Sequence, residues 1–193
     1  MKSAKKVTYH HGDLRSALVA LAMEHVRKNG ADSFSLREAA RGAGVTSGAA
    51  YKHFADRDEL LAAVAAEALL LLAKRTQKAT EGLNGKERLA AAAMAYIEFA
   101  SAEPRLFRLA FSRFGSDSRA EVDGIPDSFE QLRIAVAGVQ TDPGKPVETD
   151  RLSLAWAVAH GVASLISDGM WKKNDPRVEG ALRMAFKGIA PEK

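Results

Sequence analysis

The sequence predicts an all-α protein with about nine helices. Apolar residues recur at the three- and four-residue spacing of helices, and no run of alternating polar and apolar residues indicates a strand. Aromatic residues are only 7% of the 193 residues and alanine runs are frequent, which favours helices over a β-sandwich. Cysteine is absent, which excludes disulfides, thiolate metal sites and cysteine nucleophiles.

The first three helices are marked by their ends. The first closes on two cations followed by Gly30, a typical left-handed cap. The second opens with the capping box Ser35-Leu36-Arg37-Glu38 and ends where Gly44 turns the chain. Thr46 then caps a short third helix. The expected ranges are 13–28, 36–43 and 47–54.

The remaining helices are also marked by signals at their ends. A second capping pattern at residues 56–59 precedes a long fourth helix of about 23 residues. Proline in a first turn marks the helices that begin near Pro104, Pro126 and Pro176. Small and polar residues at 115–124 and 140–148 indicate loops. The expected ranges are 57–79, 86–102, 104–114, 126–138, 149–168 and 176–189.

Positive charge gathers at the amino-terminal end. The whole chain has a net charge of +4, with 28 Lys and Arg and 24 Asp and Glu. Residues 1–55 hold nine of the basic and four of the acidic residues, a net charge of +5, so the rest of the chain is at −1. A basic end on a nearly neutral body indicates a partner that is a polyanion. Lys2, Lys5 and Lys6 form a basic arm, either disordered or inserted in a minor groove.

Residues 35–54, SLREAARGAGVTSGAAYKHF, have the organisation of a helix-turn-helix. Small residues let the two helices approach, and Ala49 and Ala50 keep the second slim enough for a major groove. Tyr51, Lys52 and His53 place hydrogen-bond donors where DNA phosphates pass. Tyr51 alone could equally be a core residue, but its neighbours favour a phosphate contact.

The motif residues closely resemble the tetracycline-repressor (TetR) family of transcriptional regulators. The resemblance spans about residues 9–71 and is carried by Phe34-Ser35-Leu36-Arg37, Ala43-Gly44-Val45-Thr46, Gly48-Ala49-Ala50-Tyr51-Lys52-His53-Phe54 and Asp58-Glu59-Leu60-Leu61. It implies a DNA-binding domain at residues 1–56 and a helical effector-binding and dimerisation domain at 57–193. It also implies DNA contacts from Ser35, Arg37, Thr46, Ser47, Gly48, Ala49, Tyr51, Lys52, His53 and Arg57.

The carboxy-terminal body resembles one branch of that family more weakly. The branch has Trp-His-Gly in its penultimate helix, whereas residues 156–161 here read WAVAHG, so that His-Gly is kept and the adjacent Trp is replaced. His160 is either a packing residue or an effector contact. The candidate effector-binding residues, which could equally be ordinary core, are Phe99, Phe107, Phe111, Trp156 and His160.

The last two helices are expected to form a homodimer. Residues 149–168 are apolar on two sides, and a helix apolar on two sides is buried on two sides. One side would face its own chain and the other a second copy, although both helices could simply complete a monomer core. The predicted interface consists of Trp156, Val158, Val162, Leu165, Leu182, Ala185 and Phe186.

The sequence therefore predicts a DNA-binding transcriptional regulator. The leading hypothesis is a repressor that a small-molecule effector releases from double-stranded operator DNA; the alternative is an activator or a ligand-independent regulator of the same fold. An all-α enzyme is the third class, but no metal-ligand spacing, phosphate loop or nucleophile elbow supports it. No cofactor and no metal are expected. A cytoplasmic location without membrane contact is expected, because no secretory signal or membrane-length apolar run is visible.

Overall fold

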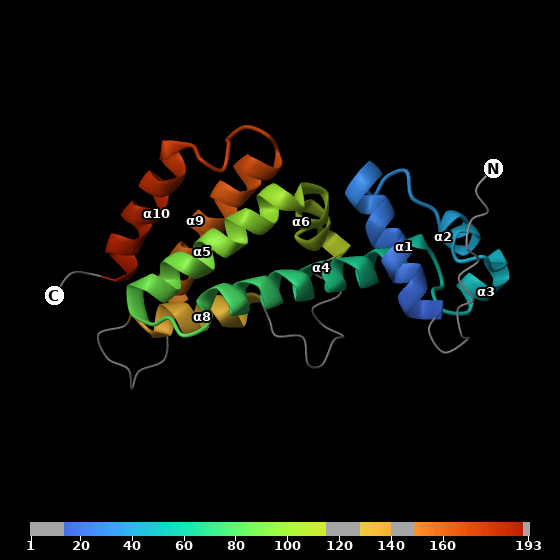
Figure 1. The fold of residues 1–193 in the computed structure, drawn as a ribbon, viewed down its shortest axis with the longest axis horizontal. Coiled ribbons are helices and arrows are strands. Elements are labelled where there is room, and N and C mark those ends of the chain that lie inside the picture. Colours follow the sequence, from blue (N-terminus) through green and yellow to red (C-terminus); the bar gives the residue numbers. More distant parts are fainter. Residues whose placement is uncertain (1–13, 115–127, 140–148, 191–193) are drawn as a thin grey trace.

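The computed structural model describes residues 14–114, 128–139 and 149–190, and every regular element within these ranges is a helix (Figure 1). The predicted all-α class is therefore confirmed. The loops expected at 115–124 and 140–148 and the basic arm lie outside the described residues. The helices are α1 (Leu14–Asn29), α2 (Leu36–Gly42), α3 (Ser47–Tyr51), α4 (Arg57–Thr80), α5 (Gly85–Ala102), α6 (Pro104–Ala110), α8 (Ser128–Ala137), α9 (Thr149–Ser167) and α10 (Pro176–Ile189).

The long helix α4 joins the two halves of the molecule. Its 24 residues span about 36 Å at 1.5 Å per residue. Helices α1, α2 and α3 gather at its amino-terminal end, α5, α8, α9 and α10 lie at the other end, and α6 sits between the halves (Figure 1). Asp56 fixes the start of α4, because its carboxylate accepts the backbone N–H of Glu59 at 2.8 Å.

One apolar cluster runs through both halves. Leu18 of α1, Phe54 just before α4 and Leu61 of α4 belong to it, and so do Ile97 of α5 and Leu106 of α6. Each of these side chains is 1% exposed or less. A smaller cluster joins α5, α8, α9 and α10. Helix α4 contributes to this core along most of its length and so packs against both halves.

Two helices end earlier than the sequence predicts. Helix α3 stops at Tyr51 instead of residue 54, since the N–H groups of His53 and Phe54 both bond to the carbonyl of Ala50. This turn sends the Phe54 ring into the core at 1% exposure. Helix α6 stops at Ala110 instead of residue 114, and the Ser112 hydroxyl satisfies the carbonyl of Leu109 at 2.7 Å.

Candidate DNA-binding surface and effector site

Helices α2 and α3 and the turn between them form the candidate DNA-binding surface. Ser35 caps α2 by accepting the N–H of Glu38 at 3.2 Å, and its hydroxyl donates to the Glu38 carboxylate at 3.1 Å. Gly44 turns the chain with φ of +71°, a conformation that favours glycine. Thr46 caps α3 by accepting the N–H of Ala49 at 3.3 Å. Both helix starts are therefore fixed by the residues that the sequence indicates.

The ten predicted DNA-contacting residues all retain exposed surface. Arg37, Thr46, Gly48, Tyr51 and Lys52 are the most open, and the Tyr51 side chain is 48% exposed. Ser35, Ser47, Ala49, His53 and Arg57 are half-buried. An exposed tyrosine next to a lysine suits a phosphate contact, because the phenol can donate to an anion without losing packing.

Arg57 is engaged inside the protein. Its guanidinium donates to the carbonyls of Phe34 at 3.0 Å and Ala31 at 2.7 Å, and to Asp58 at 3.1 Å. These bonds tie the start of α4 to the loop between α1 and α2, and they compete with the DNA contact predicted for Arg57.

The sequence analysis did not name Arg41 as a candidate DNA contact, although its side chain is 79% exposed one helical turn after Arg37.

Ala50 has a different role from the one that the sequence suggested. Its side chain is fully buried, so it faces the core and not a DNA groove. Ala49 beside it is half-buried and keeps the solvent side of α3 slim. Periodicity alone leaves this choice open, because α3 is only five residues long.

In the body, His160 of α9 lies within a group of aromatic rings. The Trp156 ring stacks on it at 5.1 Å between centroids, and the Phe111 and Phe107 rings lie at 4.9 and 5.5 Å. The Tyr96 hydroxyl of α5 lies 2.8 Å from His160 Nδ1. This aromatic cluster (Tyr96, Phe107, Phe111, Trp156 and His160) brings together three helices and the residue that follows α6.

The structure brings together four of the five predicted effector residues. Phe99 is the exception: it is fully buried near α4, with the Arg75 guanidinium 5.3 Å from its ring centroid. Tyr96 was missed, although a polar-tipped aromatic residue in the alanine-rich run of α5 is a signal that could have found it. Three aromatic rings and two polar groups can hold a small organic molecule and orient it.

Helix α6 connects the aromatic cluster to the DNA-binding half. Arg105 donates to the carbonyls of Arg27 and Lys28, at 2.9 and 2.7 Å, and so satisfies the last turn of α1. Arg108 does the same for α9, by donating to the carbonyl of Ser167 at 2.6 Å. Phe107 lies between these two arginines in the sequence and contacts His160.

The predicted dimer residues divide into two groups. Val162, Leu182 and Ala185 are 4%, 6% and 7% exposed and pack inside their own chain, which leaves them little surface for a partner. Val158, Leu165 and Phe186 are half-buried, and Trp156 is 36% exposed. The two apolar sides of α9 were recognised, but periodicity does not say which side faces inward.

Besides Trp156, further apolar residues of these helices face solvent. Leu154 is 41% exposed and Met184 is 77% exposed, and Ala157 and Gly161 are also open. A Cβ built on Gly188 would lie 3.5 Å from Leu154, so α9 and α10 lie side by side here. We call this surface, consisting of Leu154, Ala157, Gly161, Met184 and Gly188, the α9–α10 outer face.

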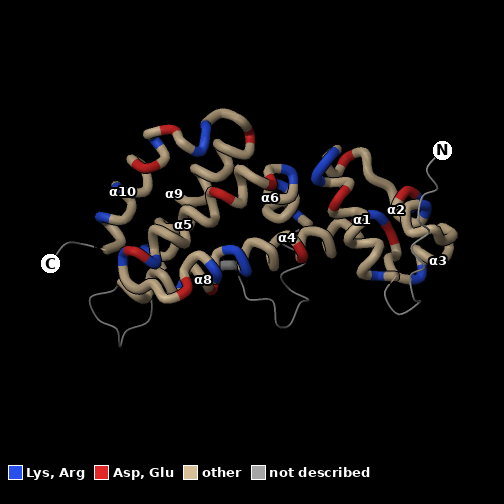
Figure 2. The backbone as a smooth tube through the Cα atoms, in the orientation of Figure 1, with Lys and Arg blue, Asp and Glu red and all other residues tan. Residues whose placement is uncertain are grey.

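Three carboxylates among the described residues have a lowered pKa, each beside a basic side chain. Lys and Arg occur over both halves of the described chain (Figure 2). Side-chain hydrogen bonds from their basic partners lower the pKa of Glu24, Glu130 and Asp175; the two glutamates are exposed and Asp175 is half-buried. Within residues 14–114, 128–139 and 149–190, no three metal-ligating side chains gather and no helix could span a membrane.

Two family models match the chain. "Bacterial regulatory proteins, tetR family" matches residues 18–64, and "Tetracyclin repressor-like, C-terminal domain" matches residues 89–186. Fold and site thus define a helix-turn-helix transcriptional regulator, and the chain belongs to the TetR family. It is a DNA-binding transcriptional regulator. The resemblance to the Trp-His-Gly branch stays a prediction.

Solved structures agree with this family. A protein of unknown function from Rhodococcus sp. RHA1 is 32% identical, with 95% of this chain and 99% of that chain covered and a TM-score of 0.73. BioQ, in complex with its double-stranded DNA operator, is 23% identical, with 96% and 100% covered and a TM-score of 0.64. A TetR-family regulator from Pectobacterium atrosepticum is 20% identical, with 94% and 96% covered and a TM-score of 0.67. No curated protein matches significantly.

Proposed function

We propose that the protein is a repressor that binds operator DNA as a homodimer and leaves it when a small-molecule effector binds in the body. The observation that carries this proposal is the position of α6. One short helix contributes Phe107 to the aromatic cluster and Arg105 to the last carbonyls of α1. An effector bound among the rings and a DNA duplex bound at the other end therefore act on the same element.

The proposed switch follows from these contacts. A ligand that enters beside His160 displaces Phe107 or Phe111 and moves α6 with it. Arg105 then either releases the α1 carbonyls or moves α1 with α6. Either change alters the angle of the helix-turn-helix relative to the body. A ligand that favours the shifted arrangement moves a two-state equilibrium away from the DNA-binding form.

The angle of the helix-turn-helix matters because a homodimer places two such units on one DNA duplex. Paired helix-turn-helix units bind half-sites about 34–36 Å apart, so a small rotation of each unit removes both from register. The α9–α10 outer face is the surface we assign to the partner. Its glycines and alanine allow close approach of helices, and Leu154 and Met184 supply apolar side chains that a second copy would cover.

DNA binding is tested with duplexes from the region that flanks the protein's own gene. The labelled duplex and a scrambled duplex are titrated by fluorescence anisotropy at about 50 and 200 mM salt. We expect a preference for the native duplex and a steep loss of affinity with salt, because phosphate contacts release counterions. The charge reversal Lys52→Glu should abolish binding. Lys78→Glu, the same change on α4 far from the helix-turn-helix, should not.

Repression is tested separately with a reporter placed behind the bound DNA. Expression should fall when the protein is supplied and rise when its gene is removed. Expression that falls on removal of the gene would identify an activator. DNA binding unaffected by every compound that binds the purified protein would identify a regulator that does not respond to ligand.

A further inference from the structure

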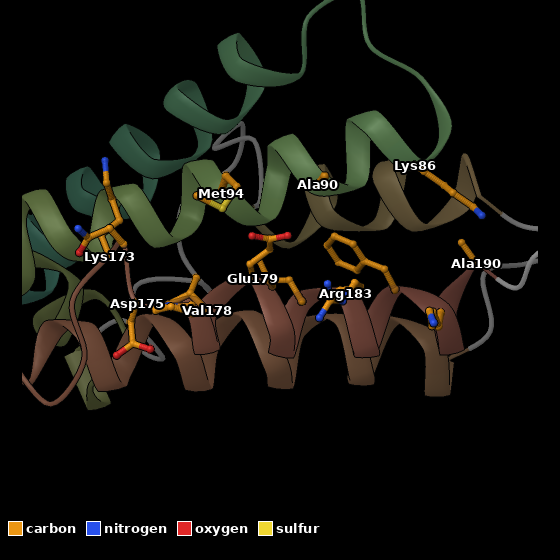
Figure 3. A pocket seen from close by; sticks show the side chains of 14 residues that line it. Lys86, Ala90, Met94, Lys173, Asp175, Val178, Glu179, Arg183 and Ala190 are labelled. Atoms are coloured by element: carbon orange, nitrogen blue, oxygen red, sulfur yellow. The ribbon is translucent and has the colours of Figure 1, made fainter.

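A groove separates α5 from α10 on the body. It has a volume of about 830 Å³, within the size range of small-molecule sites. Its floor is apolar: Val178 and Leu182 of α10 are buried, Phe186 is half-buried, and Met94 of α5 is 37% exposed above them (Figure 3). A chain that leaves such a floor open to water gains free energy when something apolar covers it.

The charges along the groove are unequal at its two ends. Lys86 of α5 lies beside Ala190 at one end (Figure 3), and Lys187 of α10 lines the groove three residues before Ala190. Both lysines are exposed, and among the described residues neither has an acidic partner within 4.0 Å. Glu179 is two turns, or about 12 Å, from Lys187 along α10. In the middle of the groove Glu179 is accompanied by Arg183, one turn further along α10, whereas the end at Lys86 and Lys187 has two cations and no acid among its lining residues.

At the other end, the charged residues are already paired. Asp175 accepts two hydrogen bonds from the Arg177 guanidinium, at 2.9 and 2.7 Å. Lys173 donates to Glu98 at 3.2 Å. These charges are paired with one another, so this end of the groove holds no excess of positive charge. The Lys86–Lys187 end is therefore the part of the groove where two cations lie without an acid among the lining residues.

We propose that this groove binds an amphipathic organic anion, a carboxylate with an apolar tail of medium length. The carboxylate lies between Lys86 and Lys187, as far from Glu179 as the groove allows. The tail lies over Leu182 and Val178 and under Met94, along about 12 Å of α10 between residues 178 and 186. Charge complementarity fixes the direction of the ligand, and the apolar floor supplies the affinity.

This site is distinct from the aromatic cluster. Met94 and Tyr96 are two residues apart on α5, so their side chains point to opposite sides of that helix. Tyr96 contacts His160 of α9, whereas Met94 lines the groove toward α10. The proposal therefore does not depend on the effector site described above, and both sites can be occupied together.

The test titrates the purified full chain with sodium decanoate by isothermal titration calorimetry. Sodium acetate supplies the carboxylate alone, and decyltrimethylammonium supplies the same tail with the opposite charge. Wild-type protein should bind decanoate at least tenfold more tightly than either. The double variant Lys86→Glu/Lys187→Glu should lose at least tenfold in decanoate affinity, and Met94→Glu should weaken binding similarly.

Matched controls separate binding in this groove from binding elsewhere on the protein. Lys172→Glu makes the same charge change on an exposed residue outside the groove, and it should bind decanoate like the wild type. Each variant is checked by circular dichroism and light scattering. Three results would overturn the proposal: no decanoate binding to the wild type, binding that survives the double lysine variant, or binding lost in Trp156→Ala but kept in Met94→Glu. A change of mass in the lysine variant with no decanoate binding would assign the groove to a second copy and would also overturn it.

Discussion

The Tyr96 hydroxyl and His160 Nδ1 lie 2.8 Å apart, although 64 residues separate them in the sequence. The bond joins α5 to α9 at a point where both side chains are surrounded by aromatic rings. A hydrogen bond in such surroundings is stronger than in water and fixes the orientation of both groups. It therefore holds the imidazole in a defined orientation against the Phe111 and Trp156 rings.

Replacing Tyr96 by Phe removes this bond and keeps the ring. We expect Tyr96→Phe to lower the free energy of unfolding by about 1–2 kcal/mol, because His160 Nδ1 is left part-buried without the phenol. Urea denaturation followed by circular dichroism measures the change. Tyr51→Phe is the matched control, since the exposed Tyr51 hydroxyl should contribute little to stability. Equal stability of wild type and Tyr96→Phe would show that the bond is not maintained in solution.

Glu103 connects the two halves of the molecule. Its carboxylate, only 16% exposed, accepts from Arg27 of α1 at 3.1 Å and from Arg75 of α4 at 3.3 Å. We expect Glu103→Gln to lower the unfolding free energy by about 1–3 kcal/mol, because two hydrogen bonds to charged groups are weakened. Glu24→Gln also removes an ion pair with α1 cations, but on an exposed side chain, and should change stability much less.

The same Glu103 variant also tests communication between the halves. If Glu103 and Arg105 hold α1 in the DNA-binding arrangement, Glu103→Gln should weaken operator binding although no DNA contact is altered. Full operator affinity in a folded Glu103→Gln protein would restrict this ion pair to a role in stability.

The Asp175 carboxylate makes the stability of α10 depend on pH in the acidic range. Hydrogen bonds from the Arg177 side chain, and then from its backbone N–H, lower the pKa of Asp175 to about 2 from an ordinary 3.8. The stabilisation is complete above the ordinary pKa and is lost as the pH falls toward about 2. Asp175→Asn should therefore flatten the fall of the thermal midpoint between about pH 4 and pH 2. Asp32→Asn, at an exposed position away from α10, should leave that slope unchanged.

Local signals were sufficient for the helices and their order. Caps such as Ser35, Thr46 and Asp56 act within four residues, so the sequence displays them directly. The end of α3 was less visible, because it depends on Phe54 entering the core. Long-range pairs such as Tyr96 with His160 leave no local trace, and neither does the choice of which side of α9 is buried.

In the candidate sites too, the residues set by a local motif were predictable and those set by long-range packing were not. The residues proposed to face DNA could be named from the sequence because a family motif fixes their positions on two short helices. Arg57 shows the limit of that assignment, since its bonds to the carbonyls of Ala31 and Phe34 depend on how the loop after α1 folds back. Phe99 was grouped with Phe107 and Phe111 by residue type, but it lies on the side of α5 that meets α4.

On the DNA-binding surface, Tyr51 and Lys52 should behave differently. Tyr51→Phe should weaken binding to operator and to random DNA by similar factors, because a phosphate contact positions the protein without reading sequence. Lys52→Ala should relax the preference at one base pair by about 1–3 kcal/mol. Anisotropy titrations against a set of single-base operator variants measure both. If Lys52→Ala lost affinity equally for operator and random DNA, Lys52 would be a phosphate contact. As a control, Tyr96→Phe should leave DNA binding unchanged in the absence of effector.

The dimer is best tested with a pair of substitutions on neighbouring helices. Met184 is 77% exposed on the α9–α10 outer face, whereas Val162 is 4% exposed in the core of its own chain. Met184→Glu should leave the helicity and thermal midpoint of the chain intact and shift the mass in light scattering from about twice 20.7 kDa to 20.7 kDa. Val162→Glu should instead unfold the chain, because it buries an unpaired charge.

The two outcomes separate packing within a chain from packing between chains. Operator binding should fall when Met184→Glu splits the dimer, since a single helix-turn-helix unit makes only half of the phosphate contacts. Leu154→Glu, on the adjacent helix of the same face, should give the same result. If both variants remain dimeric, the α9–α10 outer face is not the interface, and the second copy must cover another surface of the body.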